Sequence, residues 1–509
     1  MPLSFAIGLA ALFSVCLMIY STRFFQMIQQ YGYNCKKFLK WLFSRGLFEL
    51  CTGVVITSAA FISEFFNINP VLFMPIVGVT GFFILYKIPS ALPVKVTRRL
   101  IRLAASATAV WFMASMLSIY FGMNAMSYAA LALSPFIILL VNVMLRPLEK
   151  QISESYLRRA EAKLKRIHPL KIAVTGSYGK TTAKNILAEM LKTRYRVCAT
   201  PLSYNTPLGI SVAVNDNLKE GDEIFIAEMG ARKQGDIAFL TRTVMPEIAV
   251  ITAVGNQHLE TFGSLENIKK AKSELPENLP CGGRAYFNGD NSVVYEMYTK
   301  YGGNKTLTGK TGDVRYDNVV MSVKGTEFDL IAGGKCVRVC TKLIGKHIPS
   351  MICLCASVAL ELGVTLSEIK NAISALQPVA HRLQMLYNGS DVIIDDSFSS
   401  NEAGFESATE VLSQFSYLIK VIITPGVVEL GKAQYDVNYR LGRLAAKSCD
   451  YLIVIGGNAQ PLKRGALSAG LPPRCVIEAK SRTEAMEHYK KIRGGKAVLF
   501  ENDLPDSYG

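Results

Sequence analysis

Residues 175–182, Thr-Gly-Ser-Tyr-Gly-Lys-Thr-Thr, combine the residue types that bind a polyphosphate. They follow an apolar run, 172–174, and lead into a helical pattern. In such a strand, turn and helix, the glycines let backbone N–H groups converge on an anion, and the helix N-terminus adds its positive dipole end. Lys180 can reach the terminal phosphates and the Thr181 hydroxyl can ligate Mg²⁺. The turn therefore predicts binding of a nucleoside triphosphate, although Val174 replaces the first glycine of the full GxxxxGK[ST] pattern.

Two later strand-like runs end in residues that could serve a metal ion at the same site. Glu228 closes one run, and His258 follows a second run and a glycine turn, with Lys272 on a helical pattern soon after. Parallel strands present ligands at their carboxyl ends, so these side chains can meet. A carboxylate and a threonine hydroxyl suit Mg²⁺, whereas histidine is an unusual ligand for so hard an ion. Taken singly, Glu228 could equally be a surface acid and His258 a core histidine.

The surrounding pattern predicts two α/β domains that position these residues. From Pro169 to about Pro378 short apolar runs alternate with helical runs, which is typical of a mostly parallel sheet. Antiparallel strands are expected over 306–344. A second, Rossmann-like alternation begins near His381 and ends with a strand over 497–500. Its expected elements are strands at 392–396, 418–424 and 451–455 and helices at 405–415 and 435–448.

The N-terminal region is apolar enough to enter a membrane. Half of the chain is hydrophobic, and each of five stretches approaches the roughly 20 residues that span a bilayer as a helix. They are Leu3–Tyr20, Leu47–Phe66, Val71–Tyr86, Leu103–Phe121 and Met126–Leu145. The third is the shortest, and Pro70 and Pro75 leave its start open, so that four spans is the alternative count.

Basic residues predict the orientation of these spans. Lysines and arginines follow the first, third and fifth stretches and are missing from the loops after the second and fourth. The positive-inside rule then places the N-terminus outside and everything beyond Arg146 in the cytoplasm. Residues 1–165 hold 16 Lys and Arg against 5 Asp and Glu, so anionic lipids explain most of the net charge of +16 without nucleic acid. The first stretch lacks the marks of a cleavable signal, and the eleven cysteines show no CxxC spacing.

Residues 171–430 resemble a Mur ligase, an ATP-dependent, amide-forming family of peptidoglycan synthesis, and are most similar to its MurF type, which adds D-alanyl-D-alanine to the muramoyl tripeptide. The resemblance lies in six ordered segments. These are Thr175–Thr182, Ala227–Ala231, His258–Ser264, Ala271–Glu274, Arg382 and Asp395–Asn401.

This resemblance implies roles for individual residues. The catalytic set would be Lys180, Glu228, His258 and Lys272. The nucleotide-binding set would be Gly176, Ser177, Gly179, Lys180, Thr181, Thr182, His347, Arg382 and Asp396. The metal set would be Thr181, Glu228, His258 and Lys272. The implied cofactors are ATP and Mg²⁺, with Lys272 carbamylated; the alternative is an unmodified Lys272 that contacts phosphate directly.

The chain also departs from the family pattern. Apolar stretches stand where the family has a UDP-binding domain, which favours a lipid-linked acceptor over a UDP-linked one. Ile348 and Met351 occupy the places of asparagines that contact adenine, and Ser399 replaces another asparagine. The run 204–209 differs from the usual double asparagine, and 499–505 differs from the usual C-terminal ending.

The predicted organisation is a helical membrane domain of about five spans followed by α/β domains. Its boundaries are 1–146 for the membrane domain, 147–168 for a charged helical linker, 169–379 for the ATP-binding domain and 380–509 for the Rossmann-like domain. The predicted function is a multi-pass plasma-membrane ligase, with its ligase domains in the cytoplasm, that joins an amino acid or dipeptide to a cell-envelope precursor. Its expected partners are ATP, these substrates and membrane lipids. The alternatives are an ATP-driven transporter and a nucleotide-binding scaffold for envelope synthesis.

Overall fold

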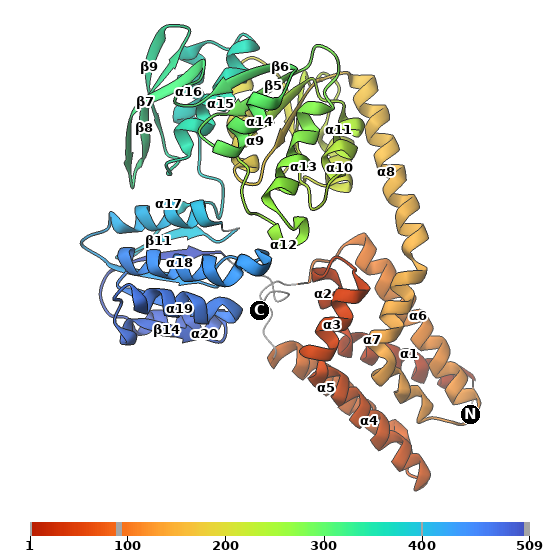
Figure 1. Ribbon diagram of the computed structural model, residues 1–509. Helices are drawn as coiled ribbons and strands as arrows, with labels where there is room; N and C mark the ends of the chain where they lie inside the picture. The colour runs from red at the N-terminus through yellow and green to blue at the C-terminus, as the bar shows by residue number, and fades with distance from the viewer. Residues whose placement is uncertain (1–2, 88–93, 399–400, 503–509) are drawn as a thin grey trace. The chain divides into compact units, whose positions relative to one another are not determined.

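The computed structural model describes residues 3–87, 94–398 and 401–502, so Ser399 and the end of the run 499–505 lie outside the described residues. The chain forms two compact units, a first that ends at Ile152 and a second that begins at Ser153. Figure 1 labels many of the elements of both units.

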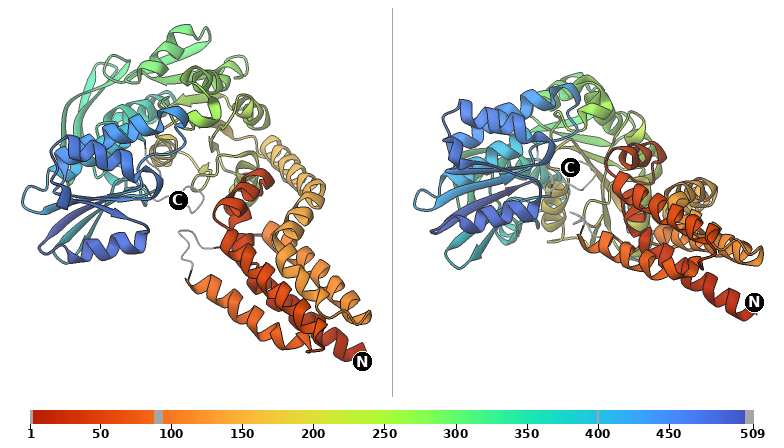
Figure 2. Two further views of the ribbon diagram at one scale, coloured as in Figure 1. Left: turned by 60° about the horizontal axis from the view of Figure 1, so that its bottom comes forward. Right: turned by 90° about the horizontal axis from the view of Figure 1, so that it is seen from below.

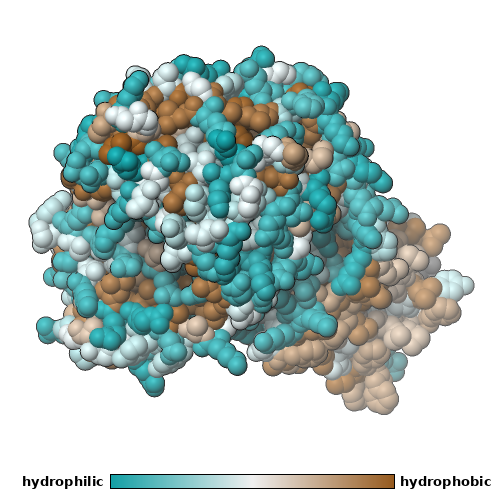
Figure 3. Space-filling model, turned by 45° about the horizontal axis from the view of Figure 1, so that its top comes forward, coloured by the Kyte–Doolittle hydropathy of each residue, from teal (hydrophilic) through white to brown (hydrophobic). Residues whose placement is uncertain are grey.

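The first unit is built from apolar helices that expose large apolar side chains. Four of them are long and apolar enough to cross a membrane. These are α1 (Leu3–Tyr20), α4 (Leu47–Phe65), α6 (Arg98–Tyr120) and α7 (Met126–Met144). Met113 and Leu117 on α6 are 70% and 62% exposed, a cost in water that a bilayer removes. In Figure 3 hydrophobic residues, drawn in brown, dominate the visible surface of this unit at the lower right.

The third predicted stretch differs from the other four. Pro70 begins a short 3-10 turn, Pro70–Phe73, and the helix that follows, α5 (Met74–Lys87), has only 14 residues. At 1.5 Å per residue this helix is shorter than the hydrocarbon core of a bilayer. The described residues therefore contain four candidate spans, and a fifth span stays a prediction.

Two amphipathic helices, α2 (Thr22–Gln30) and α3 (Cys35–Ser44), connect α1 to α4. Asn34 caps α3 by accepting the backbone N–H of Lys37 at 3.1 Å. Aromatic side chains from α2, α3 and α6 fill the centre of the unit, where Phe24, Phe38 and Trp111 are fully buried. Figure 2 shows the long helices of this unit, in red to orange, lying alongside one another.

The second unit contains a nine-stranded and a six-stranded sheet. The first has the order β2-β3-β1-β4-β5-β6-β7-β8-β9, parallel up to β7 and antiparallel from β7 to β9. Its strands are β1 (Leu170–Thr175), β2 (Val197–Ala199), β3 (Ile224–Glu228), β4 (Ile248–Ile251), β5 (Arg284–Asn288), β6 (Asn304–Thr308), β7 (Val314–Ser322), β8 (Gly325–Ala332) and β9 (Lys335–Thr341). The expected parallel strands and the antiparallel strands within 306–344 are confirmed.

Helices cover both faces of this sheet, which is why its central strands are apolar on both sides. One face carries α9 (Lys180–Leu191), α15 (Ile348–Glu361) and α16 (Leu366–Ala375). The other carries the end of α8 (Arg146–Ile167), α10 (Pro207–Asn217), α11 (Asp236–Val244), α13 (Leu265–Glu277) and α14 (Ser292–Lys300).

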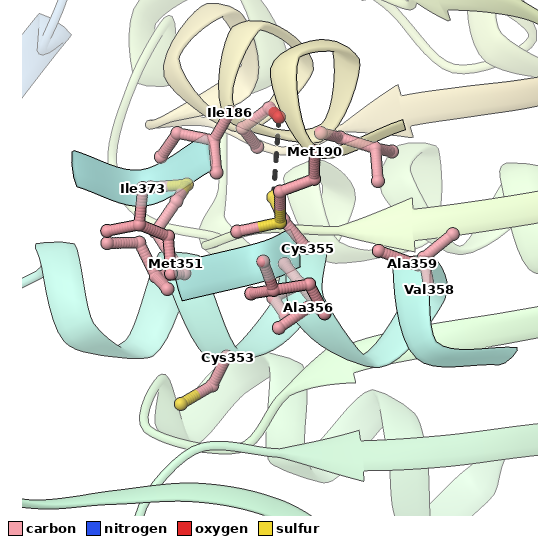
Figure 4. Close-up of a cluster of buried hydrophobic side chains, with 14 of the residues drawn as sticks. Ile186, Met190, Met351, Cys353, Cys355, Ala356, Val358, Ala359 and Ile373 are labelled. Atoms are coloured by element: carbon pink, nitrogen blue, oxygen red, sulfur yellow. Dashed lines mark hydrogen bonds between the residues drawn. The ribbon is translucent and has the colours of Figure 1, made fainter. Parts of the chain in front are cut away.

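Close packing of α9 on α15 supports the loop that precedes α9. Figure 4 shows Ile186 and Met190 of α9 against Met351, Cys355 and other apolar side chains of α15. The Cys355 thiol donates to the carbonyl oxygen of Ala183 at 3.3 Å, the dashed line in that figure. This dry contact fixes the start of α9 relative to the sheet.

The six-stranded sheet has the order β10-β11-β15-β12-β13-β14, and only β10 runs antiparallel. Its strands are β10 (Gln384–Asn388), β11 (Asp391–Asp396), β12 (Ile419–Thr424), β13 (Tyr451–Ile455), β14 (Val476–Ala479) and β15 (Lys496–Glu501). Helices α17 (Glu402–Ser413), α18 (Gln434–Ser448) and α19 (Ala459–Ser468) pack on one face, and α20 (Arg482–Lys491) packs on the other.

The sequence analysis missed β10, β14, α19 and α20. Helix α19 was hidden by Pro461 and Gly465, two poor helix formers. Pro461 is tolerated because it lies in the first turn, where a backbone N–H has no intrahelical partner. Gly465 is required because a Cβ there would lie 2.0 Å from the carbonyl oxygen of Tyr439 on α18.

Helices α18 and α19 touch through backbone, which generates a stability prediction. A Cβ on Gly442 would lie 2.1 Å from the carbonyl oxygen of Leu462, so Gly442→Ala must push the helices apart. We expect a loss of about 1–3 kcal/mol in the local free energy of unfolding, the usual cost of overpacking. Hydrogen exchange of the β12 and β13 amides measures it. Gly457→Ala, where a Cβ meets open space, is the control and should leave the exchange unchanged.

Candidate active site

The register of three neighbouring strands brings the predicted site residues to one edge of the nine-stranded sheet. Strand β1 lies between β3 and β4, with Val174 opposite Glu228 and Thr175 opposite Ile251. All three strands are parallel, so their carboxyl ends face the same way. The loop after β1 and the carboxylate that ends β3 are therefore neighbours.

The loop over residues 176–179 is shaped by glycines and by the segment after β4. Gly179 has a left-handed φ of +76°, and a Cβ there would also lie 2.3 Å from the Met351 methyl carbon. A Cβ on Gly176 would lie 2.1 Å from the Thr252 hydroxyl. The Ser177 N–H donates to the carbonyl oxygen of Ala253 at 2.6 Å. The loop is thus preformed, with the free N–H groups of the first turn of α9 directly after it.

Glu228 is buried at the centre of a polar cluster. Its Oε2 accepts the Thr181 hydroxyl at 2.9 Å and the Lys184 ammonium at 3.2 Å, and its Oε1 accepts the Asn205 amide at 3.0 Å. Both side chains of the Lys184–Glu228 ion pair are 1% exposed. A carboxylate removed from water this completely is tolerated because hydrogen bonds and a countercharge replace its hydration.

Lys180, beside this cluster, and Lys272, whose charge interacts with that of Lys180, both have lowered pKa values. The pKa of Lys180 is lowered to about 8, mainly because burial disfavours the charged form; the Glu228 charge opposes this shift and the Arg382 charge adds to it. Burial lowers the pKa of Lys272 on α13 to about 7, and the nearby charge of Lys180 adds to this effect. The Lys180 ammonium donates to the carbonyl oxygens of Gly176 and Ser177 at 2.8 and 3.0 Å. Near neutral pH, Lys180 is mostly charged while a large fraction of Lys272 is neutral.

Arg382, which precedes β10, completes the cluster from the second sheet. One of its guanidinium nitrogens donates to the Thr181 hydroxyl oxygen at 3.3 Å. The guanidinium stacks on the Phe398 ring, 4.5 Å from the ring centroid. Burial lowers the pKa of Arg382, although it stays a cation. Loop residues of both sheets therefore meet at Thr181.

These residues fit a magnesium nucleotide. Thr181 donates its hydroxyl proton to Glu228 and accepts from Arg382, so one oxygen lone pair is left for a cation. Among the described residues, Oε1 of Glu228 accepts one side-chain hydrogen bond, from Asn205. Lys180, Arg382 and the N-terminus of α9 supply positive charge for phosphates. Within the described residues no three His, Cys, Asp or Glu side chains form a metal-binding group. A cation here would therefore depend on hydroxyl, carboxylate and phosphate oxygens.

The structure does not bring every predicted residue to Glu228. The Nδ1 of His258 pairs with the Glu429 carboxylate of the second sheet domain. His347 is exposed at the start of α15, and its ring lies over Gly345. Asp396, at the end of β11, accepts the Leu383 N–H at 3.0 Å, and burial raises its pKa to about 6. Thr182 is half-buried in the first turn of α9.

Three residues that were not predicted from the sequence pair with predicted site residues: Lys184 and Asn205 with Glu228, and Glu429 with His258. Lys184 follows Lys180 by one helical turn, a spacing that places both on one face of α9 and could have identified it. Asn205 lies in the run 204–209, which was noted only as a departure. Glu429 follows β12, at the carboxyl edge where ligands of parallel sheets gather.

The segment that holds these site residues is similar to a known protein family. Residues 174–359 match the Mur ligase middle domain. These residues therefore form a Mur ligase middle domain. That match begins one residue before β1 ends and stops inside α15, so it covers the loop, Glu228, His258 and Lys272.

Relatives of this domain include MurF-type ligases, as its motifs suggested. The UDP-N-acetylmuramoyl-tripeptide--D-alanyl-D-alanine ligase of Mycobacterium bovis is 31% identical over 296 residues, which are 56% of this chain and 58% of that protein. The chain thus spans less than two thirds of that relative. The crystal structure of MurF ligase from Thermotoga maritima in complex with ADP is 25% identical, with a TM-score of 0.60 over 69% of this chain and 80% of that one.

A second solved structure supports the fold alone. A crystal structure of MurF from Acinetobacter baumannii is 23% identical to this chain, with a TM-score of 0.63. The superposed region covers 69% of this chain and 77% of the Acinetobacter baumannii chain. The α/β portion of the chain therefore has the Mur ligase fold.

The buried Lys184–Glu228 pair generates a stability prediction. Lys184→Met removes the ammonium group that is hydrogen-bonded to the Glu228 carboxylate, and removing one partner of a buried ion pair costs about 3–5 kcal/mol. We expect this loss in the free energy of unfolding, measured by hydrogen exchange of the β1 and β3 amides. Lys346→Met is the matched control. It breaks an ion pair with Glu410 whose side chains are 69% and 31% exposed, and such surface pairs contribute at most about 1 kcal/mol. Equal losses in the two variants would contradict the prediction.

Proposed function

We propose that the chain is an ATP-dependent, ADP-forming ligase that joins the amine of an amino acid or dipeptide, such as D-alanyl-D-alanine, to a carboxylate of a peptidoglycan precursor. The observation that carries the proposal is the meeting of Lys180, Thr181, Glu228 and Arg382 at one sheet edge. It is supported by the match of the surrounding residues to the Mur ligase middle domain.

The site residues suit transfer of a phosphoryl group to a carboxylate. An acceptor carboxylate oxygen attacks the γ-phosphorus, the bond to ADP breaks, and an acyl phosphate forms. The amine then attacks the acyl carbon, loses a proton and expels phosphate. Lys180 and Arg382 offset the negative charge that accumulates on the phosphoryl oxygens. Thr181 and Glu228 would hold Mg²⁺, which would supply further positive charge when bound.

Lys272 is suited to carry a carbamate. Its neutral amine can attack CO₂, forming an N–C bond and releasing one proton, which converts the neutral amine into an anionic carbamate. The lowered pKa of about 7 makes this amine available near neutral pH. The negative charge would lie near Lys180, which weakens the repulsion that the two ammonium groups would otherwise exert. His258 and Asp396 stay proposed ligands of the metal and of the nucleotide.

The reaction products test the proposal. Purified full-length protein in detergent with ATP, Mg²⁺, a muramoyl tripeptide acceptor and D-alanyl-D-alanine should release ADP and phosphate only when both substrates are present. Lys180→Ala should lower the rate by at least about 10²-fold, because a charge that stabilises the transition state is lost. AMP and pyrophosphate as products would reject the acyl-phosphate scheme.

A second experiment tests the state of Lys272. With ¹³C-labelled bicarbonate, the ¹³C spectrum of the full-length protein should show a carbamate signal that Lys272→Arg removes. Only the neutral amine reacts, so at a fixed CO₂ pressure the signal should rise as pH increases through about 7. A signal that persists in Lys272→Arg, or that is missing from the wild type at pH 8, would favour an unmodified lysine that contacts phosphate.

The carrier of the acceptor is a separate part of the proposal. The relatives' names specify a UDP-linked muramoyl tripeptide, whereas only the four apolar helices in the same chain favour a lipid-linked one. Parallel assays with both carriers decide between them. A higher kcat/KM on the lipid-linked acceptor would assign a substrate-presenting role to the helical unit.

We further propose that the helical unit anchors the ligase in the plasma membrane with the ligase portion in the cytoplasm, where ATP is available. The basic loops after α1 and α5 support this orientation. An ATP-driven transporter would lose turnover on soluble substrate analogues when residues 1–145 are deleted, whereas a ligase would keep it. A scaffold would keep its cellular role in Lys180→Ala.

A further inference from the structure

A network of side-chain amides holds the loop after β12 rigidly. Asn438, which is fully buried, accepts the Val427 N–H at 2.9 Å and donates to the Val427 carbonyl oxygen at 2.9 Å. Asn458 donates to the Pro425 carbonyl oxygen at 3.0 Å, and Asn502 donates to that of Gly426 at 2.7 Å. Three amides from α18, from the turn before α19 and from the end of β15 therefore fix the backbone of 425–427.

This loop presents Glu429 to the central domain. The Glu260 N–H of the short helix α12 (Leu259–Phe262) donates to the Glu429 carbonyl oxygen at 2.9 Å. The Glu429 carboxylate pairs with Nδ1 of His258, the residue that precedes this helix. A Cβ on Gly431 would lie 3.4 Å from the Cα of Glu260, so the two backbones are also in close contact. The loop and the His258 turn are joined by both backbone and side chain.

The pairing determines which nitrogen of His258 carries a proton. An ionised carboxylate only accepts hydrogen bonds, so the Nδ1 that faces Glu429 must carry a hydrogen. In the neutral imidazole, Nε2 then keeps its lone pair. Histidines that ligate metals are commonly oriented in this way, with a carboxylate on the opposite nitrogen, and losing that carboxylate costs about 10- to 100-fold in metal affinity or activity.

We propose that Glu429 is a positioning residue that fixes the Nδ1–H tautomer of His258 when the C-terminal domain docks on the central domain. The contact crosses between the two sheets, so His258 acquires this tautomer only in the docked arrangement. Docking thereby leaves Nε2 of His258 with a free lone pair, so that this nitrogen can act as an acceptor or a ligand. The effect of Glu429 on catalysis rests on the proposed function. The assignment of the His258 tautomer does not depend on that function.

The test measures the histidine directly in the full-length protein. The chain has five histidines, so ¹⁵N-histidine labelling gives a sparse magic-angle-spinning spectrum of the protein in lipid vesicles, and His258→Gln assigns the signal. We expect the Nδ1–H form of His258 in the wild type. Glu429→Ala should shift it to the Nε2–H form that a free histidine side chain prefers, and Glu429→Gln, which can donate or accept, should give a mixture.

Glu410→Gln is the matched control because Glu410 also joins the two sheet domains, through Lys346 at 2.5 Å, but lies away from His258. It should leave the His258 signal unchanged. In the ligase assay, Glu429→Ala should lower kcat about 10- to 100-fold while the Kd for ADP without Mg²⁺ changes less than about 3-fold.

The proposal is overturned if His258 keeps the Nδ1–H form in Glu429→Ala, or if Glu410→Gln shifts the signal equally. Global misfolding of Glu429→Ala would move the other four histidine signals, and Glu429→Gln then supplies the decisive comparison. Failure of the wild type to form ADP, with the expected His258 spectrum, would reject the proposed function and leave the role of Glu429 standing.

Discussion

Burying the carboxylate of Glu228 at the end of β3 constrains every element around it. An isolated charge in that position would be expelled, so both oxygens need partners from separate segments: Thr181 and Lys184 from α9 and Asn205 from the loop after β2. These partners can reach only if β1 and β3 keep their register and if α9 starts where it does. The same hydrogen bonds that make burial tolerable also leave the Thr181 oxygen facing the phosphate loop.

The second sheet contributes to this centre through loops at the carboxyl ends of its strands and through the segment before β10. Arg382 donates to Thr181, and the Glu429 carboxylate pairs with His258, so the second domain brings one cation and one anion to the central domain. An arginine brings positive charge to where phosphates would bind, and a carboxylate orients a histidine. Reaction geometry of this kind depends on domain docking, because neither sheet alone holds the complete set.

The sequence was sufficient to predict features that are local. Periodicity located the long apolar helices and most buried strands, and the spacing of Gly179, Lys180 and Thr181 identified the phosphate loop. The sequence did not predict features that depend on a contact between segments far apart in the chain. Asn205 and Glu429 gain their roles from partners 23 and 171 residues away. Helix α19 forms despite Pro461 and Gly465 because it packs closely against α18.

Gly179 illustrates how the phosphate loop resists substitution. Its left-handed φ strains any residue that has a side chain, and the Met351 methyl group occupies the space that a Cβ would need. These are independent obstacles, one within the backbone and one from α15. Exchanging Met351 for a smaller residue would clear the space but keep the unfavourable dihedral angle, so no single compensating change elsewhere in the core would make room for another amino acid at this turn.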